Sequence, residues 1–413
     1  MINDTQKLKE VFFSLGYTKE EYLIIINNSR IKEYMEETLI KKVTDIYNYL
    51  LQNYTKEEVI KITRMAPELY CLSTGTIKQK IDDMVSLGYT KEEVIAMTKA
   101  FPQIYDHSKE NLKQRIDDMV LLGYKREEVI KMTKKAPSIH GHTIENLKQK
   151  IDNMVLLGYK REEVIKMSKT YPPIYSFSIE NIKQRIDDMI SLGYTKEEVI
   201  KITKTLPQIY SFTIENIKQK IDDMVSLGYT KEAVIKMAKT LPQIYSLSTE
   251  NKRQKIDDMV SLGYTKEEII TMTKTFPTIF GYSIESMKQK IDDMVSLGYT
   301  KKEAIKMTKK VPSIYGYSIE NIKQKIDFYD SVNLHEIAIV DPYVLVPSTA
   351  LSYARYMFFK EKGVGITIDN FKKLFTTNKK FEKFYGITKK ELLEKYDYEK
   401  HLEEQKGFGG LKW

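Results

Sequence analysis

The hydrophobic positions of this chain form helical stripes that follow one another in pairs, with polar positions between them. In the segment 193–227 the first stripe comprises, at i, i+3, i+4 and i+7, Val199, Ile202, Thr203 and Leu206. Residues with this spacing share one face of an α-helix, so the stripe predicts an amphipathic helix with one buried side. The stripe that follows predicts a second helix buried in the same way, and it comprises Ile217, Ile221, Met224 and Val225.

Turn-forming residues separate the two stripes. Thr195 stands before the first helix, where a hydroxyl can cap the free N–H groups. Pro207 ends this helix, because the residue before a proline is displaced from the α region. The short segment after Pro207 fits a 3₁₀ turn with Ile209 and Tyr210 as apolar plugs. Gly228 takes the left-handed position that ends the second helix. Each repeat is therefore helix, proline turn, helix and glycine turn.

This pattern recurs every 35 residues. The prolines that keep the period are Pro67, Pro102, Pro137, Pro172, Pro207, Pro242, Pro277 and Pro312. A fixed period in the range of 20–50 residues is typical of a solenoid, in which no repeat can bury its apolar face alone. We predict an all-α solenoid superhelix of about ten repeats. Its expected parts are an N-terminal cap repeat (1–52), eight regular repeats (53–332), a degenerate repeat (333–362) and a C-terminal helical cap and tail (363–413).

Composition indicates what kind of partner and which cellular compartment to expect. The net charge is +9 in 413 residues, which favours a polyanionic partner. Cys71 is the only cysteine, so no internal disulfide can form and a reducing compartment is expected. Neither a signal peptide nor a transit peptide is visible, and no apolar run reaches the ~18–20 residues of a membrane span. We expect a soluble intracellular protein of unknown compartment, monomeric and not bound to a membrane.

The order of motifs resembles the mitochondrial transcription termination factor (mTERF) family. The motifs are LGY-[ST]-x-E-E-V-x-K-M, then F-P-x-I-Y-S-x-S, then a second helix ending in LG, and the resemblance covers at least residues 11–362. The segments Val346–Leu351 and KKLFTTNKKFEKFYG look like the C-terminal end of that family. The resemblance implies two α-helices and a 3₁₀ turn per repeat, with double-stranded DNA bound along a basic groove. Some members of the family act on RNA or in ribosome assembly.

Two columns of basic residues lie on the first helices. The last-turn column is basic in all eight regular repeats and comprises Arg64, Lys99, Lys134, Lys169, Lys204, Lys239, Lys274 and Lys309. The middle column lies one turn earlier and comprises Lys61, Lys131, Lys166, Lys201, Lys236 and Lys306, with Ala96 and Thr271 as interruptions. Residues three apart share a helix face, so stacked repeats should merge the columns into a basic ribbon that contacts nucleic acid. The alternative is that these lysines only complement helix dipoles and aid solubility.

A further basic set lies on the second helices, for example Lys218 and Lys220. Aspartates such as Asp222 and Asp223 lie nearby in sequence. This set is therefore interpreted as a solvated face that pairs with them, rather than as a site.

Positions beside the proline vary from repeat to repeat. Two residues before it stand Lys135, Thr170, Thr205, Thr240, Thr275 and Lys310, and just after it stand, among others, Gln103, Gln208 and Gln243. Short polar side chains of this kind could read base edges. Neutral drift on an exposed turn explains the same variation.

Signals for catalysis do not occur in the sequence. There is no Gly-rich phosphate loop, nucleophile elbow or zinc-spaced cluster, so we expect neither enzymatic activity nor a cofactor. We interpret His107, His140 and His142 as surface histidines near the turns rather than as metal ligands. The tyrosines that recur after the proline, such as Tyr210, are interpreted as core. The sequence thus favours a protein that binds double-stranded DNA, with a possible role in transcription regulation or termination. RNA binding, and a protein-interaction scaffold that uses the same groove, remain alternatives.

Overall fold

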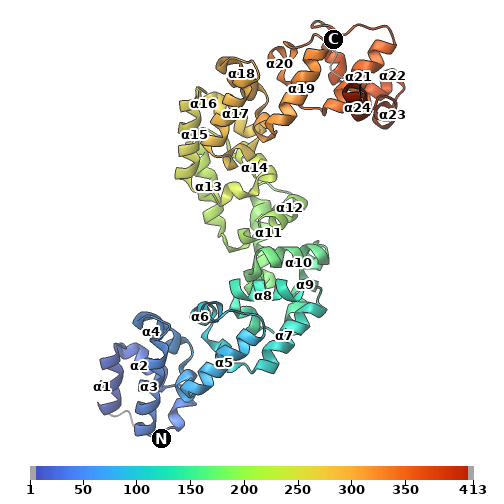
Figure 1. Ribbon diagram of the computed structural model, residues 1–413. Helices are drawn as coiled ribbons and strands as arrows, with labels where there is room; N and C mark the ends of the chain where they lie inside the picture. Colours follow the sequence, from blue (N-terminus) through green and yellow to red (C-terminus); the bar gives the residue numbers. More distant parts are fainter. Residues whose placement is uncertain (1–5, 408–413) are drawn as a thin grey trace. The chain divides into compact units, whose positions relative to one another are not determined.

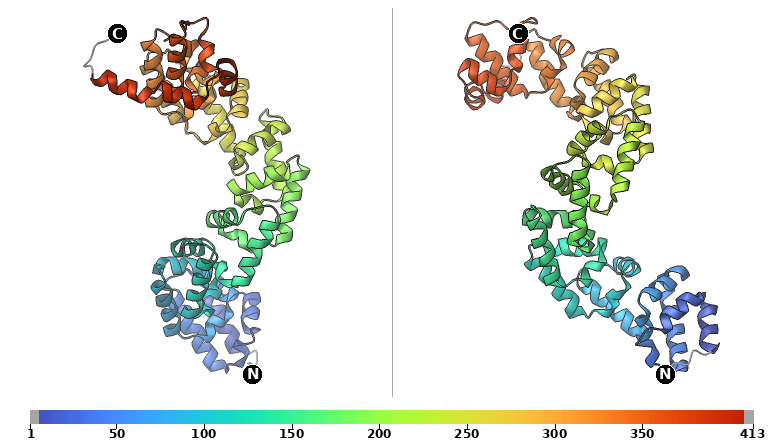
Figure 2. Two further views of the ribbon diagram at one scale, coloured as in Figure 1. Left: turned by 90° about the vertical axis from the view of Figure 1, so that its right-hand side faces the viewer. Right: turned by 180° about the vertical axis from the view of Figure 1, so that it is seen from behind.

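The computed structural model describes residues 6–407, and all regular structure in that range is helical (Figure 1). The chain divides into two compact units, one up to Ile214 and one from Glu215 onward. Within each compact unit, helix pairs joined by a 3₁₀ turn stack on their neighbours, as Figure 2 shows from two further sides. The predicted 35-residue repeat of helix, proline turn and helix is confirmed.

The first compact unit holds a run of α-helices and 3₁₀ helices (η). They are α1 (Gln6–Leu15), α2 (Lys19–Ile26), η1 (Ile31–Glu33), α3 (Glu36–Leu50), α4 (Lys56–Met65), η2 (Pro67–Cys71), α5 (Thr74–Ser86), α6 (Lys91–Ala100), η3 (Pro102–Asp106), α7 (Lys109–Leu121), α8 (Arg126–Lys135), η4 (Pro137–Gly141), α9 (Ile144–Leu156), α10 (Arg161–Thr170), η5 (Pro172–Ser176), α11 (Ile179–Ser191), α12 (Lys196–Thr205) and η6 (Pro207–Ser211).

The second compact unit continues the pattern and then loses it. Its helices are α13 (Ile214–Ser226), α14 (Lys231–Thr240), η7 (Pro242–Tyr245), α15 (Thr249–Leu262), α16 (Lys266–Thr275), η8 (Pro277–Gly281), α17 (Ile284–Ser296), α18 (Lys301–Lys310), η9 (Pro312–Gly316), α19 (Ile319–Ser331), α20 (Ile337–Val340), η10 (Pro342–Leu345), α21 (Thr349–Glu361), η11 (Phe371–Phe375), α22 (Asn378–Tyr385), α23 (Lys389–Lys395) and α24 (Tyr398–Gly407). Residues 408–413 of the predicted tail lie outside the described residues.

Local chemistry explains where each first helix begins and ends. At α12 the hydroxyl of Thr195 accepts from the N–H of Glu198, and the Glu198 carboxylate accepts from the N–H of Thr195. This reciprocal capping box satisfies two N–H groups that lack partners within the helix. At the other end Leu206 has φ −131° and ψ 71°, outside the α region, because Pro207 follows it. The predicted cap and stop are both confirmed.

The second helices bury a narrower stripe than the sequence predicts. In α13, Ile217, Ile221 and Met224 are buried, but Val225 is 43% exposed. The prediction for Val225 was wrong, because packing against one neighbouring layer covers only the residues that point directly at it. Gly228 then turns the chain with φ +105°, and a Cβ at this position would lie 2.9 Å from Ile270 Cδ1 of the next repeat. Glycine is therefore required by both the backbone and the close approach.

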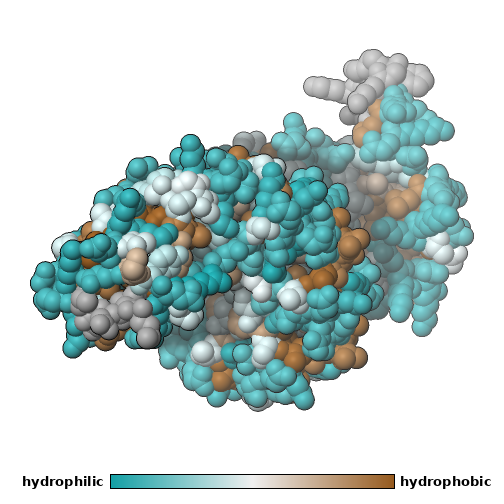
Figure 3. Space-filling model, turned by 90° about the horizontal axis from the view of Figure 1, so that it is seen from below, coloured by the Kyte–Doolittle hydropathy of each residue, from teal (hydrophilic) through white to brown (hydrophobic). Residues whose placement is uncertain are grey.

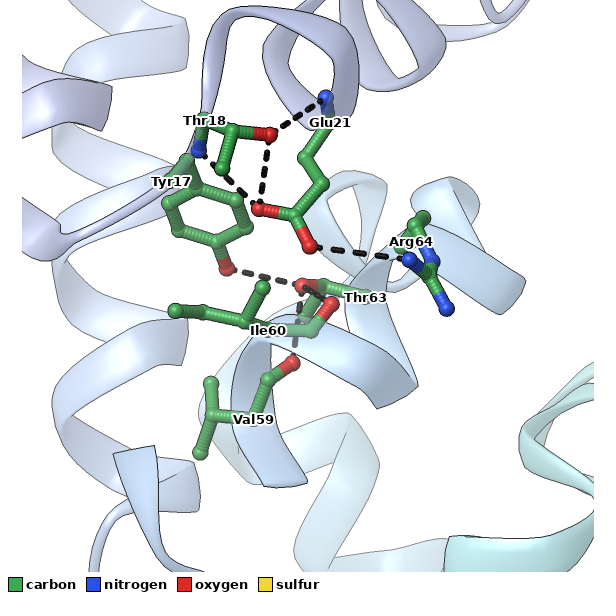
Figure 4. A network of polar contacts seen from close by, with 7 residues as sticks. All are labelled: Tyr17, Thr18, Glu21, Val59, Ile60, Thr63 and Arg64. Carbon is green, nitrogen blue, oxygen red and sulfur yellow. Dashed lines mark hydrogen bonds and ion pairs between the residues drawn. The ribbon is translucent and has the colours of Figure 1, made fainter. Parts of the chain in front are cut away.

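Buried hydroxyl groups join successive repeats. Tyr17 Oη lies 2.7 Å from Thr63 Oγ1 of the next repeat (Figure 4). It also lies 2.5 Å from Tyr70 Oη of that repeat. Thr63 in turn donates to the carbonyl of Val59, one turn earlier in its helix. The same arrangement joins, for example, Tyr159 with Thr203 and Tyr210, and Tyr264 with Thr308 and Tyr315. These interfaces therefore have a satisfied polar centre within an apolar surround.

The last such tyrosine is Tyr299. Tyr299 is 2% exposed, and its hydroxyl makes no hydrogen bond within the described residues. The shortened repeat that follows places the apolar residues Ala338 and Leu345 where most regular repeats have Thr or Ser and Tyr. Beyond this repeat, α21 packs against α23 and α24. The buried Arg355 of α21 donates to the carbonyl of Leu374 and to Asn378 Oδ1.

Candidate nucleic-acid interface

The last-turn column lies where consecutive repeats meet. Most of its members form an ion pair with the capping-box glutamate of the preceding repeat, and Figure 4 shows the first such pair. The N–O distances are 3.6 Å for Arg64–Glu21, 2.8 Å for Lys99–Glu58, 2.6 Å for Lys134–Glu93, 2.9 Å for Lys169–Glu128, 2.7 Å for Lys204–Glu163 and 2.6 Å for Lys309–Glu268. These basic side chains retain 32–44% of their accessible surface.

These glutamates serve two helices at once. The hydrogen bond from Lys99 and that from the backbone N–H of Thr55 lower the pKa of Glu58. The same two kinds of donor lower the pKa of Glu93. The carboxylates are therefore ionised at neutral pH, and each lowers the positive potential of the basic side chain that it contacts.

Lys274 is an exception within the described residues. The residue that would pair with it is Ala233, so no carboxylate replaces the missing glutamate and Lys274 forms no ion pair there. Ala233 also leaves the capping box of α14 incomplete, although Thr230 still accepts from the Ala233 N–H at 3.2 Å.

The middle column presents free positive charge. Its six lysines, from Lys61 to Lys306, are all exposed, and none forms an ion pair in the part of the chain that the structure describes. They lie in the centre of the first helices, one per repeat except where Ala96 and Thr271 interrupt them. Hydrophilic residues also cover most of the face seen in Figure 3. The middle column is thus the more available of the two for an external anion.

The candidate base-reading residues are partly engaged by the fold. The hydroxyls of Thr170, Thr205 and Thr275 donate to backbone carbonyls one turn earlier in their own helices. Lys310 pairs with Asp341 at 3.1 Å. The remaining members of the pre-proline set, Lys135 and Thr240, are exposed.

The three glutamines after the proline differ from one another. Gln103 donates through Nε2 to the carbonyl of Met65 in the preceding repeat at 2.8 Å. Gln208 is half-buried and Gln243 is exposed. Gln243 therefore has the most accessible amide of the three.

Basic residues of the second helices staple one repeat to the next. Lys80 donates to the carbonyl of His107 at 3.0 Å, and Lys150 donates to that of Phe177 at 2.9 Å. Both carbonyls end a 3₁₀ helix, where positive charge is favoured. Pairing with a nearby aspartate is seen for Arg185, which contacts Asp188 at 3.0 Å. The expectation of a purely solvated, aspartate-paired face was therefore wrong for Lys80 and Lys150.

The recurring aromatic residues after the proline are core, as predicted. Tyr70, Tyr105 and Tyr210, for example, are at most 4% exposed. His140 occupies the same position and is 2% exposed, 3.2 Å from Tyr89 Oη. Burial lowers the pKa of His140 to about 3, so it is neutral at pH 7. The expectation of a surface histidine was wrong for His140, while His107 and His142 are half-buried.

Comparison with known proteins identifies the family. The sequence pattern that describes mTERF proteins matches residues 2–156, 115–226 and 189–296. Together these matches span more than half of the chain. This protein belongs to the mTERF family. mTERF proteins are generally nucleic-acid binders and are not enzymes as a rule. No curated protein matches this mTERF chain. Across residues 6–407 no helix combines the length and the apolar character that crossing a bilayer requires.

Sequence reasoning missed the glutamate partners of the last-turn column. The signal was present, because Glu58, Glu93, Glu128, Glu163 and Glu268 keep the same 35-residue period as the lysines. Each lysine lies 41 residues after its glutamate, which is one repeat plus six residues. Periodicity alone did not reveal which side of a first helix faces the preceding repeat.

Proposed function

We propose that this mTERF protein binds double-stranded DNA, chiefly through phosphate contacts from the middle column. The observation that carries the proposal is the exposure of six lysines at equivalent positions of the first helices, without ion pairs in the described residues. Equivalent positions in packed neighbouring helices lie ~8–10 Å apart. Charges at this spacing suit a polyanion that runs along the stack.

The last-turn column has a secondary role in this proposal. Its half-exposed side chains can share a phosphate only by weakening their contact with a glutamate, so each contributes less than an unpaired lysine. Lys274, which has no such glutamate, is the member best suited to a direct phosphate contact. A role in regulating or terminating transcription would follow from sequence-selective binding. Residues 1–52 and 363–413 would then act as caps of the array.

The test compares two triple variants within the first compact unit. The first, Lys131→Ala/Lys166→Ala/Lys201→Ala, removes middle-column charge. The control, Lys113→Ala/Lys148→Ala/Lys183→Ala, removes equally exposed lysines from second helices, with the same change in net charge. Affinity for duplex DNA is measured from low to high salt. The first variant should flatten the slope of log K against log salt by about 1 per lost contact, while the control should not.

Equal slopes for the two triple variants would reject the middle column as the binding surface. Parallel titrations with single strands and structured RNA separate DNA from RNA as the preferred ligand. If the affinity for nucleic acid is low and the first variant does not change it, the exposed lysines instead support the alternative function, which is a protein scaffold that uses the same surface.

A further inference from the structure

Two neighbouring second helices end in leucines that face solvent. Leu121 of α7 and Leu156 of α9 are each 83% exposed. At the same position six other second helices carry serine, namely Ser86, Ser191, Ser226, Ser261, Ser296 and Ser331. These serine hydroxyls donate to a carbonyl of their own helix, as Ser86 does to Asp83 at 2.6 Å. The leucines therefore give up a local hydrogen bond and bury almost nothing in return.

The same two repeats differ at a second position. Lys125 and Lys160 stand where the other regular repeats have a threonine that caps the next helix, such as Thr90. A lysine side chain cannot accept a hydrogen bond, so this replacement also gives up a stabilising cap. Both lysines are exposed and form no ion pair within the described residues. Two adjacent repeats thus exchange local stability for exposed apolar and positive groups.

A third difference holds the exposed groups in place. Arg126 contacts Asp117 at 3.0 Å and Arg161 contacts Asp152 at 3.3 Å. Each ion pair spans the glycine turn that joins the leucine to the lysine. The ion pair restricts the motion of the turn, so less conformational entropy of the exposed leucine and lysine is lost when a partner binds.

We propose that Leu121, Leu156, Lys125 and Lys160 form a docking surface for an acidic amphipathic helix of a partner protein. The leucines would be buried by apolar residues of that helix, and the lysines would meet its acidic residues. Pairing with the same surface of a second copy of this chain fits poorly, because its lysines would face these lysines. Nucleic acid also fits poorly, because a phosphate backbone offers little apolar surface to cover two leucines.

The spacing of the surface indicates how the partner is patterned. Helices α7 and α9 pack against each other, so their equivalent residues lie ~8–10 Å apart. In a helix, residues seven apart are separated by ~10.5 Å along the axis. An occupant that crosses α7 and α9 would thus present apolar residues at i and i+7, with acidic residues beside each of them.

The test uses a designed probe and the full chain. The probe is a labelled helical peptide of about 18 residues with leucines at i, i+3 and i+7 flanked by glutamates. A matched peptide carries lysine in place of glutamate. Binding is measured by fluorescence anisotropy with the native chain and with Leu121→Ser/Leu156→Ser. This variant restores the serine of the other repeats, so folding, followed by circular dichroism, should be preserved. We expect it to weaken binding of the acidic peptide by roughly 10- to 100-fold.

A transplant gives a reciprocal test. Ser261→Leu/Ser296→Leu/Thr265→Lys/Thr300→Lys builds the same four residues at the ends of α15 and α17 and at the caps of the helices that follow them, and α15 and α17 also pack against each other. Added to the double serine variant, these changes should restore binding of the acidic peptide. Equal affinity of the native and double serine chains for this peptide would overturn the proposal, and so would equal affinity for the two peptides. Both chains are also titrated with vesicles of phosphatidylcholine and phosphatidylserine. If the double serine variant loses binding to these vesicles but not to the acidic peptide, the proposal is overturned in favour of a lipid surface.

Discussion

A buried lysine should weaken the second compact unit. Lys252 of α15 is 1% exposed and occupies the position that Ile217 and Met287 fill in the neighbouring second helices. Burial, and then the nearby charge of Lys220, lower the pKa of Lys252 from 10.5 to about 8, and Asp223 opposes the shift. We predict that Lys252→Leu stabilises the protein at pH 7.

The magnitude follows from the displaced pKa. Each pKa unit corresponds to about 1.4 kcal/mol, so moving from 10.5 to about 8 sets a ceiling of about 3.5 kcal/mol. The flexible lysine stem lets the ammonium approach Asp223 and water, which reduces the gain. We expect the free energy of unfolding to rise by about 1–3 kcal/mol. Below pH 8 both the folded and unfolded chains carry this charge, so the full penalty applies there.

The assay is urea denaturation of the full chain at several pH values. Between pH 8 and pH 10.5 the folded protein releases the Lys252 proton before the unfolded chain does, so the wild-type penalty disappears. The advantage of Lys252→Leu over wild type should shrink across this window. Arg253→Leu, at an exposed neighbouring position, serves as the control. A gain that is absent at pH 7, or that stays constant up to pH 10.5, would refute the reasoning.

Four further substitutions give three more predictions. Tyr264→Phe should cost about 1–3 kcal/mol because it removes the buried hydrogen bonds of Tyr264 with Thr308 and Tyr315, whereas Tyr299→Phe should be neutral or stabilising because its hydroxyl makes no hydrogen bond within the described residues; thermal unfolding compares the two. Ala233→Glu should complete the capping box and pair with Lys274, raising the urea midpoint by the equivalent of about 0.5–1.5 kcal/mol, and an unchanged midpoint would count against the interface ion pairs. The neutral, buried His140 favours the folded state less and less as pH falls from 6.5 towards 3, because only the unfolded chain gains a proton in this window. His140→Tyr, which restores the residue of other repeats, should therefore reduce acid sensitivity, measured as stability at pH 5 relative to pH 7.

Much of the fold could be predicted because each repeat contains the residues that begin its helices, end them and turn the chain. Thr195 caps a helix, Pro207 ends it and Gly228 turns the chain, and all three act on residues within one turn of themselves. Repetition at a fixed period then removed the ambiguity that single motifs carry. Prediction failed at Val225, because a helical stripe indicates direction but not how far the neighbouring layer extends.

The candidate site was harder to predict because charge pairing is a property of the stack. Lys204 and Glu163 lie in different repeats, and nothing within either repeat indicates that they meet. The partner of Lys150 could not be predicted for the same reason, because its acceptor is the carbonyl that ends the next 3₁₀ helix. The exposed middle column, by contrast, could be located from helical spacing alone. Its role in binding stays a prediction that the two triple variants test.

The bonds between repeats also bear on how this protein forms during synthesis. The side-chain hydrogen bond between Tyr17 and Tyr70 joins positions 53 apart in the chain, and the equivalent bond between Tyr159 and Tyr210 joins positions 51 apart. A repeat can therefore form these polar contacts soon after the next repeat leaves the ribosome. A chain whose contacts are this local folds quickly and in order from its N-terminus. Folding of the N-terminal repeats does not require the C-terminal end of the chain. Few apolar stripes are therefore left uncovered while translation continues.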